Sequence, residues 1–311
     1  MMKKSGIGVS MPRHDAARQV TGKSLYGADI DMPGMLWCKI LRSGRPSAKI
    51  LSIDTSEAEA FPGVAAVVTA KDVACNEYGV THIDQPFFAD KITRQYSDAL
   101  AAVAADTEAI AAEAVKLIRV KYEDLPLLTD PALAMKEDSY KIHGNNSNIA
   151  VHKKIISGDV EKGFSESKYV IEQDLSTPGI EHCSIEPHNA ISYIDDMTGD
   201  LVIRSSVQKP FELATDIAKM LNRPISSVRA IASDVGGGFG GKNEPAMEPA
   251  IVLLTLKTGR PVKCEYTRED EFNATTIRHP YFIHYKTGIA EDGKILARQV
   301  RIISDSGPYV S

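Results

Sequence analysis

SVRAIASDVGGGFGGKNEPAMEPAIVLLTLKTGRPVKCE, residues 227–265, is the stretch that predicts the fold of this chain. Its β-branched residues favour a strand over 227–235, which the first glycine ends. Good helix formers predict a helix over 247–257, and the Gly-Arg-Pro sequence after them is typical of a helix stop. A second strand is predicted over 262–266.

A cluster of glycines connects this strand to this helix. Five of the six residues over 236–241 are glycine, and Phe239 is the exception. Glycine adopts positive φ at little cost and lets the backbone approach a ligand closely. We expect such a loop, followed by a helix N-terminus, to present several backbone N–H groups to an anionic ligand.

A mononucleotide is one candidate ligand. Residues 236–242 match the G-x-x-x-x-G-K core of a phosphate-binding loop. The next residue is Asn243, so the Ser or Thr hydroxyl that binds magnesium in such loops is missing. The sequence therefore disfavours a mononucleotide site.

A dinucleotide is a second candidate ligand. Gly236, Gly238 and Gly241 spell G-x-G-x-x-G, and Glu265 lies about where a ribose-binding acid is expected. However, polar residues interrupt the strand before the loop, whereas buried parallel strands are continuous apolar runs. The sequence after Arg268 is hairpin-like and provides no second βα repeat. This alternative is also disfavoured.

The glycine cluster belongs to a longer pattern. With Gln208 upstream, Thr-Gly-Arg-Pro-Val at 258–262 and Arg-His-Pro at 278–280, the chain resembles the molybdopterin-binding part of the xanthine dehydrogenase and aldehyde oxidase family. The resemblance continues upstream over 22–126. It implies an α+β fold, in which a hammerhead domain precedes the first part of a molybdopterin-binding domain. The predicted division is an N-terminal arm over 1–20, the hammerhead domain over 21–135, a polar linker over 136–155 with Gly-Asn-Asn at 144–146, and an incomplete molybdopterin-binding domain over 156–311.

The resemblance implies a cofactor site without protein ligands to the metal. Gln208 would hydrogen-bond an apical oxygen ligand of molybdenum, where the residues alone suggest only a polar loop position. Phe239 and Gly240 would offer backbone N–H groups to an oxygen ligand or to the pterin, and Gly238 and Gly241 would be further cofactor-binding residues of the loop. From the residues alone, Phe239 could equally be a hydrophobic anchor.

Asn243 is the expected substrate-binding residue and departs from the family pattern. It occupies the position of a glutamate that binds substrate in the purine-oxidising members. An amide donates and accepts hydrogen bonds but does not shuttle a proton at neutral pH. Xanthine is therefore in doubt as the substrate.

A metal site is an alternative for residues 181–188. On a strand, His182, Glu186 and His188 would share one face, but Pro187 disfavours a central strand there. The resemblance implies that this segment lines the approach to the cofactor without binding a metal.

Local patterns predict the remaining elements. Pro210 is expected to open a helix, because its missing N–H has no partner in the first turn of a helix. The apolar face of that helix is predicted to comprise Phe211, Leu213, Ala214, Ile217, Ala218 and Leu221. Other predictions are a helix over 107–118, strands over 36–41, 64–69, 99–105, 120–124, 169–175, 190–194 and 201–207, and a hairpin of 281–289 with 294–303.

The composition limits the function. A chain of 311 residues with 43% apolar residues should bury two cores. A net charge of −5 with dispersed basic residues does not predict nucleic acid binding, and no stretch is apolar enough to predict a membrane span or a signal peptide. Four scattered cysteines predict reduced thiols in the cytoplasm and no iron–sulfur site within this chain.

The resemblance implies a molybdenum hydroxylase that oxidises an N-heterocycle or an aldehyde with water-derived oxygen; the chemistries of relatives that oxidise carbon monoxide or reduce aromatic acyl-thioesters stay open. The cofactor would be molybdenum-molybdopterin, with its cytosine dinucleotide form left open. Iron–sulfur clusters and FAD would lie on partner subunits, and the family's catalytic glutamate lies beyond the equivalent of 311, so no catalytic residue is expected here. The alternative is a folded module that binds no cofactor.

Overall fold

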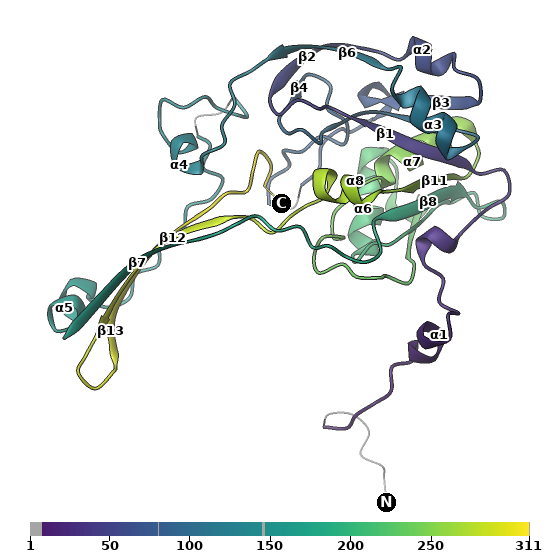
Figure 1. Ribbon diagram of the computed structural model, residues 1–311. Coiled ribbons are helices and arrows are strands. Elements are labelled where there is room, and N and C mark those ends of the chain that lie inside the picture. The colour runs from purple at the N-terminus through teal and green to yellow at the C-terminus, as the bar shows by residue number, and fades with distance from the viewer. Residues whose placement is uncertain (1–7, 80, 145–146, 311) are drawn as a thin grey trace, which may run out of the picture.

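A seven-stranded mixed sheet forms the centre of the molecule, in the order β10-β9-β8-β11-β1-β5-β3 (Figure 1). The structure is a computed structural model that describes residues 8–79, 81–144 and 147–310. Residues 1–7 of the predicted arm and 145–146 of the predicted linker turn lie outside the described residues. The strands are β1 (Leu36–Arg42), β3 (Val64–Thr69), β5 (Ala99–Ala105), β8 (Asn189–Ile194), β9 (Leu201–Ser205), β10 (Val228–Ala232) and β11 (Val262–Glu265).

The two predicted domains share this sheet. Strands β1, β3 and β5 come from the predicted hammerhead segment, and the other four come from the molybdopterin-binding segment. The two sets meet where β1 runs parallel to β11, with Leu36 opposite Val262 and Trp37 opposite Lys263. A continuous hydrogen-bonded sheet therefore crosses the predicted boundary.

Helices cover both faces of the sheet. α6 (Pro210–Met220) and α7 (Glu248–Thr258) pack on one face, and α2 (Ser56–Glu59) and α3 (Glu108–Val115) pack on the other. Successive side chains of a strand point to opposite faces, so alternate residues of β5 enter two clusters of buried side chains. The sequence predicted two cores, and the two clusters among the described residues lie on opposite faces of one sheet.

Helix α7 follows its prediction closely, because its stop signal is strong. Gly259 ends it with φ +68°, a backbone conformation that glycine adopts without strain. Helix α6 also begins at Pro210 as predicted, but Phe211 is 83% exposed and does not belong to the buried face. That face is centred on Leu213 and Ile217, and at 3.6 residues per turn Phe211 lies beyond its edge.

A separate three-stranded sheet projects away from the central sheet (Figure 1). It consists of β7 (Tyr169–Thr177), β12 (Tyr281–Ile289) and β13 (Ile295–Ser304), and the predicted β12–β13 hairpin is confirmed. α5 (Val160–Ser165) packs on β13 so closely that a Cβ on Gly163 would lie 2.7 Å from the Leu296 oxygen.

The other elements are short. A small sheet joins β4 (Ile92–Thr93), β2 (Ala48–Asp54) and β6 (Arg119–Asp124), and β2 was not predicted. The sequence after Arg268 was predicted to be hairpin-like, but it begins helix α8 (Arg268–Ala274), because Thr267 and Asp270 form a capping box. The remaining helices are α1 (Ala16–Val20), α4 (Pro131–Ala134) and three 3-10 turns at Gly27–Asp29, Ala70–Asp72 and Ile225–Ser227.

Candidate functional site

The glycine loop, residues 236–242, follows β10 but does not run directly into the N-terminus of α7. The next residues form turns, and the side chain of Glu248 at the start of α7 is only 2% exposed. Glu248 Oε2 accepts a hydrogen bond of 2.8 Å from the Ala246 N–H. The start of α7 is therefore buried, and the expectation that the glycine loop presents backbone N–H groups to an anionic ligand stays a prediction.

Gln208 lies against the glycine loop, although the two are distant in sequence. Its Oε1 accepts hydrogen bonds from the N–H groups of Gly240 (3.0 Å) and Lys242 (3.2 Å). Its own N–H donates to the Lys242 oxygen at 2.7 Å. A Cβ on Gly238 would lie 2.6 Å from Gln208 Cδ, so only glycine leaves room for this side chain.

The loop uses some of its N–H groups internally. The Gly240 N–H donates to Gln208, and the Gly241 N–H donates to the Gly238 oxygen at 2.8 Å. The Gly240 N–H was expected to bind an oxygen ligand of the metal or the pterin, whereas here it binds Gln208. Within residues 8–79, 81–144 and 147–310, the Gly238 and Phe239 N–H groups and Gln208 Nε2 have no hydrogen-bond partner. These donors are the ones that could bind an oxygen-rich ligand.

Phe239 occupies a strained position. Its φ of +52° is uncommon for a residue with a side chain, and such strain clusters at functional sites. The side chain is 75% exposed, so the alternative of a buried hydrophobic anchor is wrong. Half-buried Asn243 lies beside the same loop, with its Nδ2 3.9 Å from a Cβ placed on Gly240. Its predicted contact with substrate stays a prediction.

Residues 181–188 form an irregular segment against the loop, not the strand on which the metal alternative depended. His182 lies over Gly241, where a Cβ would be 2.7 Å from His182 Nδ1. That nitrogen is buried and has no partner among the described residues. No group of three or more His, Cys, Asp or Glu side chains suited to a metal ion occurs in the described part of the chain.

Lys242 and Glu186 form a buried ion pair beneath the loop. Lys242 Nζ lies 2.9 Å from Glu186 Oε2 and donates to the Glu186 backbone oxygen at 2.9 Å. The same Oε2 accepts the Gly236 N–H at 2.7 Å. Because the Lys242 side chain is 1% exposed, it cannot contact a nucleotide phosphate, which removes the mononucleotide alternative.

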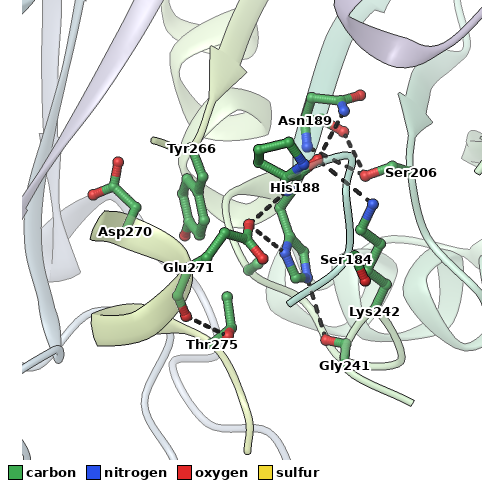
Figure 2. A network of polar contacts seen from close by, with 12 residues as sticks. Ser184, His188, Asn189, Ser206, Gly241, Lys242, Tyr266, Asp270, Glu271 and Thr275 are labelled. Atoms are coloured by element: carbon green, nitrogen blue, oxygen red, sulfur yellow. Dashed lines mark hydrogen bonds and ion pairs between the residues drawn. The ribbon is translucent and has the colours of Figure 1, made fainter. Parts of the chain in front are cut away.

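His188 and Glu271 form a second buried pair (Figure 2). His188 Nδ1 lies 2.8 Å from Glu271 Oε1, which also accepts the His188 N–H at 2.6 Å, and His188 Nε2 lies 3.2 Å from the Gly241 oxygen. Burial acts to raise the pKa of Glu271. The hydrogen bonds and charge of His188, with the charge of Lys242, outweigh burial, so this pKa is lowered.

Glu271 is the residue that sequence reasoning missed. It lies on α8, which the polar sequence after Arg268 did not suggest. The Thr-x-x-Asp pattern of Thr267 and Asp270 is a capping-box signal that could have revealed the helix. Nothing local indicates that the buried side of this short helix would carry a carboxylate.

The dinucleotide alternative fails on two features. Glu265 forms an ion pair of 2.9 Å with Lys263, a side chain that is 2% exposed. Strands β10 and β11, which flank the loop and α7, are separated in the sheet by β9 and β8. A dinucleotide fold requires the acid to be available and the two strands to be neighbours.

The features of the loop fit a cofactor that is held by hydrogen bonds. Gln208 Nε2 and two backbone donors lie together without a partner in the described structure, beside a strained, exposed Phe239. The absence of a Cβ at 236, 238 and 241 lets the side chains of Glu186, Gln208 and His182 pack directly against the loop. This set offers donors for oxygen atoms and no ligand set for a metal ion.

Comparison with known families decides the relationship. Residues 142–311 match the family model described as the molybdopterin cofactor-binding domain, and residues 21–126 match the aldehyde oxidase and xanthine dehydrogenase a/b hammerhead domain. The chain belongs to the xanthine dehydrogenase and aldehyde oxidase family. The predicted family and α+β fold class are confirmed.

Members of the xanthine dehydrogenase and aldehyde oxidase family match over nearly the whole chain. A probable xanthine dehydrogenase subunit of Bacillus subtilis (strain 168) is 37% identical over 303 residues, covering 97% of this chain and 40% of that protein. The nicotinate dehydrogenase large molybdopterin subunit of Eubacterium barkeri is 37% identical over 306 residues, covering 98% and 72%. The solved aldehyde oxidoreductase from Desulfovibrio gigas has a TM-score of 0.89 at 30% identity, covering 94% of this chain and 34% of that chain.

The chain therefore spans only part of several relatives in this family, including 40% of the Bacillus protein and 34% of the Desulfovibrio protein. Within the described residues, no helix has both the length and the apolar character that crossing a membrane requires.

Proposed function

We propose that this chain forms the molybdopterin-binding portion of a molybdenum hydroxylase that oxidises an N-heterocycle or an aldehyde. The observation that carries the proposal is the convergence of Gln208 on the glycine loop. There Oε1 is held by two backbone N–H groups, which leaves Nε2 directed away from them. The Gln208 amide is therefore preorganised, and preorganised hydrogen-bond donors bind the oxygen atoms of a cofactor effectively.

Molybdopterin, when bound, supplies a redox metal that supports transfer of water-derived oxygen to a carbon atom of the substrate. The chain's own residues bind and orient that group. Gln208 would donate from Nε2 to an oxygen of the cofactor, and the N–H groups of Gly238 and Phe239 would donate beside it. Gly240 and Gly241 would shape the loop and keep Gln208 in place. No residue of this chain is proposed as the catalytic base.

The names of the relatives support the proposed class of substrate. Xanthine and nicotinate dehydrogenases are named for N-heterocycles, and the Desulfovibrio protein is named for aldehydes. Asn243 would contact the substrate, and its amide suits a neutral ring with both donors and acceptors better than it suits a cation. An N-heterocycle other than xanthine is therefore the favoured substrate.

The proposed enzyme needs further components. Iron–sulfur clusters and FAD would be on partner subunits, and other polypeptide would complete the molybdopterin site. The cytosine dinucleotide form of the cofactor is compatible with the same loop. The free cysteines among the described residues support a cytoplasmic location.

The test uses the chain produced together with the subunits encoded beside it. We expect molybdenum in the purified assembly, with Gln208→Ala lowering turnover of an N-heterocycle about 100-fold, the typical effect of losing one positioned donor. Gln173→Ala, on the exposed strand β7, is the matched control and should keep full turnover.

Two results would contradict the proposal. Assemblies without molybdenum in any preparation would favour the alternative of a structural module. Normal turnover in Gln208→Ala, with circular dichroism equal to that of the unsubstituted chain, would exclude the role given to Gln208.

A further inference from the structure

One peptide unit of the glycine loop is held at both ends. The carbonyl oxygen of Gly241 lies 3.2 Å from His188 Nε2, and the N–H of the same peptide, which belongs to Lys242, donates to Gln208 Oε1 at 3.2 Å. A continuous series of hydrogen bonds thus runs from Glu271 through His188 and this peptide to Gln208.

We propose that His188 and Glu271 are positioning residues that set the orientation of the Gly241–Lys242 peptide and, through it, the direction in which Gln208 presents its amide group to the cofactor. The inference rests on the proposed function, because it assigns a purpose to the orientation of Gln208. It adds two residues that do not themselves contact the cofactor.

The peptide needs such support because one of the two residues that flank it, Gly241, is a glycine. Gly241 has no side chain that would restrict rotation of the peptide plane, whereas Lys242 on the other side is fixed by its buried ion pair with Glu186. The other contact to the Gly241 oxygen, from Thr276 Oγ1, is long at 3.5 Å. On the Gly241 side, the contact with His188 therefore fixes the peptide, while Gln208 and the buried Lys242 side chain hold the other side.

Burial makes the His188 contact strong and specific. The side chains of His188 and Glu271 are 8% and 1% exposed, so water competes little for their hydrogen bonds. Both ring nitrogens of His188 face acceptors, Glu271 Oε1 on one side and the Gly241 oxygen on the other, an arrangement in which the imidazolium form donates from both nitrogens. Glu271 fixes the ring through one nitrogen, and the ring fixes the peptide through the other.

The consequence concerns the side-chain amide of Gln208. With the Lys242 N–H in place, Oε1 is directed toward the loop and Nε2 away from it. If the peptide turned over, Oε1 would lose one of its two donors and face a carbonyl oxygen. The amide would then lose its fixed orientation and the preorganisation on which the proposed binding depends.

Two variants of the assembled enzyme test this series of contacts. His188→Phe keeps a flat ring but removes both hydrogen bonds, and Glu271→Gln keeps the shape of the side chain but removes its charge. We expect amide hydrogen exchange over 236–242 to become about tenfold faster in His188→Phe, as for the loss of one buried hydrogen bond. A smaller increase is expected in Glu271→Gln, which also serves if His188→Phe fails to fold.

Glu248→Gln is the matched control. Glu248 is 2% exposed in the same region, and it bonds Ser205 Oγ and the Ala246 N–H but not the glycine loop. It should lower the melting temperature as much as Glu271→Gln while leaving exchange over 236–242 unchanged. Equal exchange in the Glu248 and Glu271 variants would overturn the proposal, since it would mean a general loss of stability.

Turnover separates a positioning role from a structural one. We expect His188→Phe to lower kcat about tenfold at unchanged KM, and to have no further effect when Gln208 is already Ala, because its action passes through Gln208. Losses that multiply in the double variant would contradict the proposal. If no preparation contains molybdenum, the proposed function fails, while the exchange measurement still tests the contacts themselves.

Discussion

Glycines 238 and 241 are required for different steric reasons. A Cβ at Gly238 would lie 2.6 Å from Gln208 Cδ, and one at Gly241 would lie 2.7 Å from His182 Nδ1. The glycine cluster alone predicted a close approach of some partner to the backbone. It did not reveal these partners, because they come from distant segments, and Gln208 was identified only through the family resemblance.

Gly238→Ala should remove function at little cost in stability. Its φ is not positive, and the obstructing atoms are at the flexible end of Gln208, so the side chain can move away. We expect turnover of the assembled enzyme to fall about 100-fold, as for Gln208→Ala, with a melting temperature within a few degrees of the unsubstituted chain.

The control for this variant is Gly293→Ala, in the turn between β12 and β13. Its φ of +87° makes alanine unfavourable, although the surrounding space is open. It should therefore lose stability by about 1 kcal/mol and keep its turnover. Normal turnover in Gly238→Ala would show that the packing of Gln208 on the loop does not matter.

Glu271 should make the stability of the chain sensitive to acid. The pKa of Glu271 is lowered in the folded state. Its contribution to the free energy of unfolding is therefore present above the ordinary pKa of a glutamate, about 4.3, and is lost as the pH falls through the folded-state pKa. Glu271→Gln should therefore cost about 2 kcal/mol near neutral pH, and this difference should shrink toward pH 3. Urea unfolding at several pH values measures it, and a difference independent of pH would be the contrary result.

At the scale of elements, the helices show which signals a sequence carries. α7 was predicted almost to the residue, because an apolar run and Gly259 mark it. α8 was missed because it is short and polar, and its capping box is the one sequence signal that indicates a helix there. Strand β2 was missed as well, because most of its residues are exposed or only half-buried and its apolar pattern is weak.

Thr267→Ala tests the capping box that positions Glu271. Thr267 Oγ1 accepts the Asp270 N–H at 3.1 Å, and its loss should lower the free energy of unfolding by about 1 kcal/mol. Thr215→Ala is the control, because Thr215 Oγ1 only bonds the Phe211 oxygen within α6, a contact that adds little stability. Urea unfolding compares the two, and equal effects would remove the special role of the cap.

At the scale of the whole molecule, the sequence motifs predicted two segments, and the structure joins them in one sheet. The family resemblance located both segments along the chain. It could not reveal that β1 pairs with β11, because no local pattern specifies a parallel partner so far away in sequence. The shared core follows from that pairing, since α7 packs on strands from both segments.

The cysteines report whether the sheet unfolds as a unit. Cys38 on β1 and Cys264 on β11 are 1% and 2% exposed, and burial, together with a hydrogen bond that the Cys38 thiol donates to Cys264, raises the pKa of the Cys38 thiol. We expect a thiol reagent in moderate urea to label both at one rate, the rate of global unfolding, while exposed Cys183 reacts at once. Peptide mass spectrometry distinguishes them, and earlier labelling of Cys38 would indicate separate unfolding of the first segment.

The pairing of Leu36 with Val262 also governs what a break in the backbone would do. If a protease cut the polypeptide within 136–155, the backbone hydrogen bonds between β1 and β11 would still hold the two fragments together. If the two fragments were produced separately, each would expose an unpaired edge strand, and such strands readily pair with other chains and aggregate. If two genes encoded the parts on either side of 136–155, their products would therefore have to associate during folding.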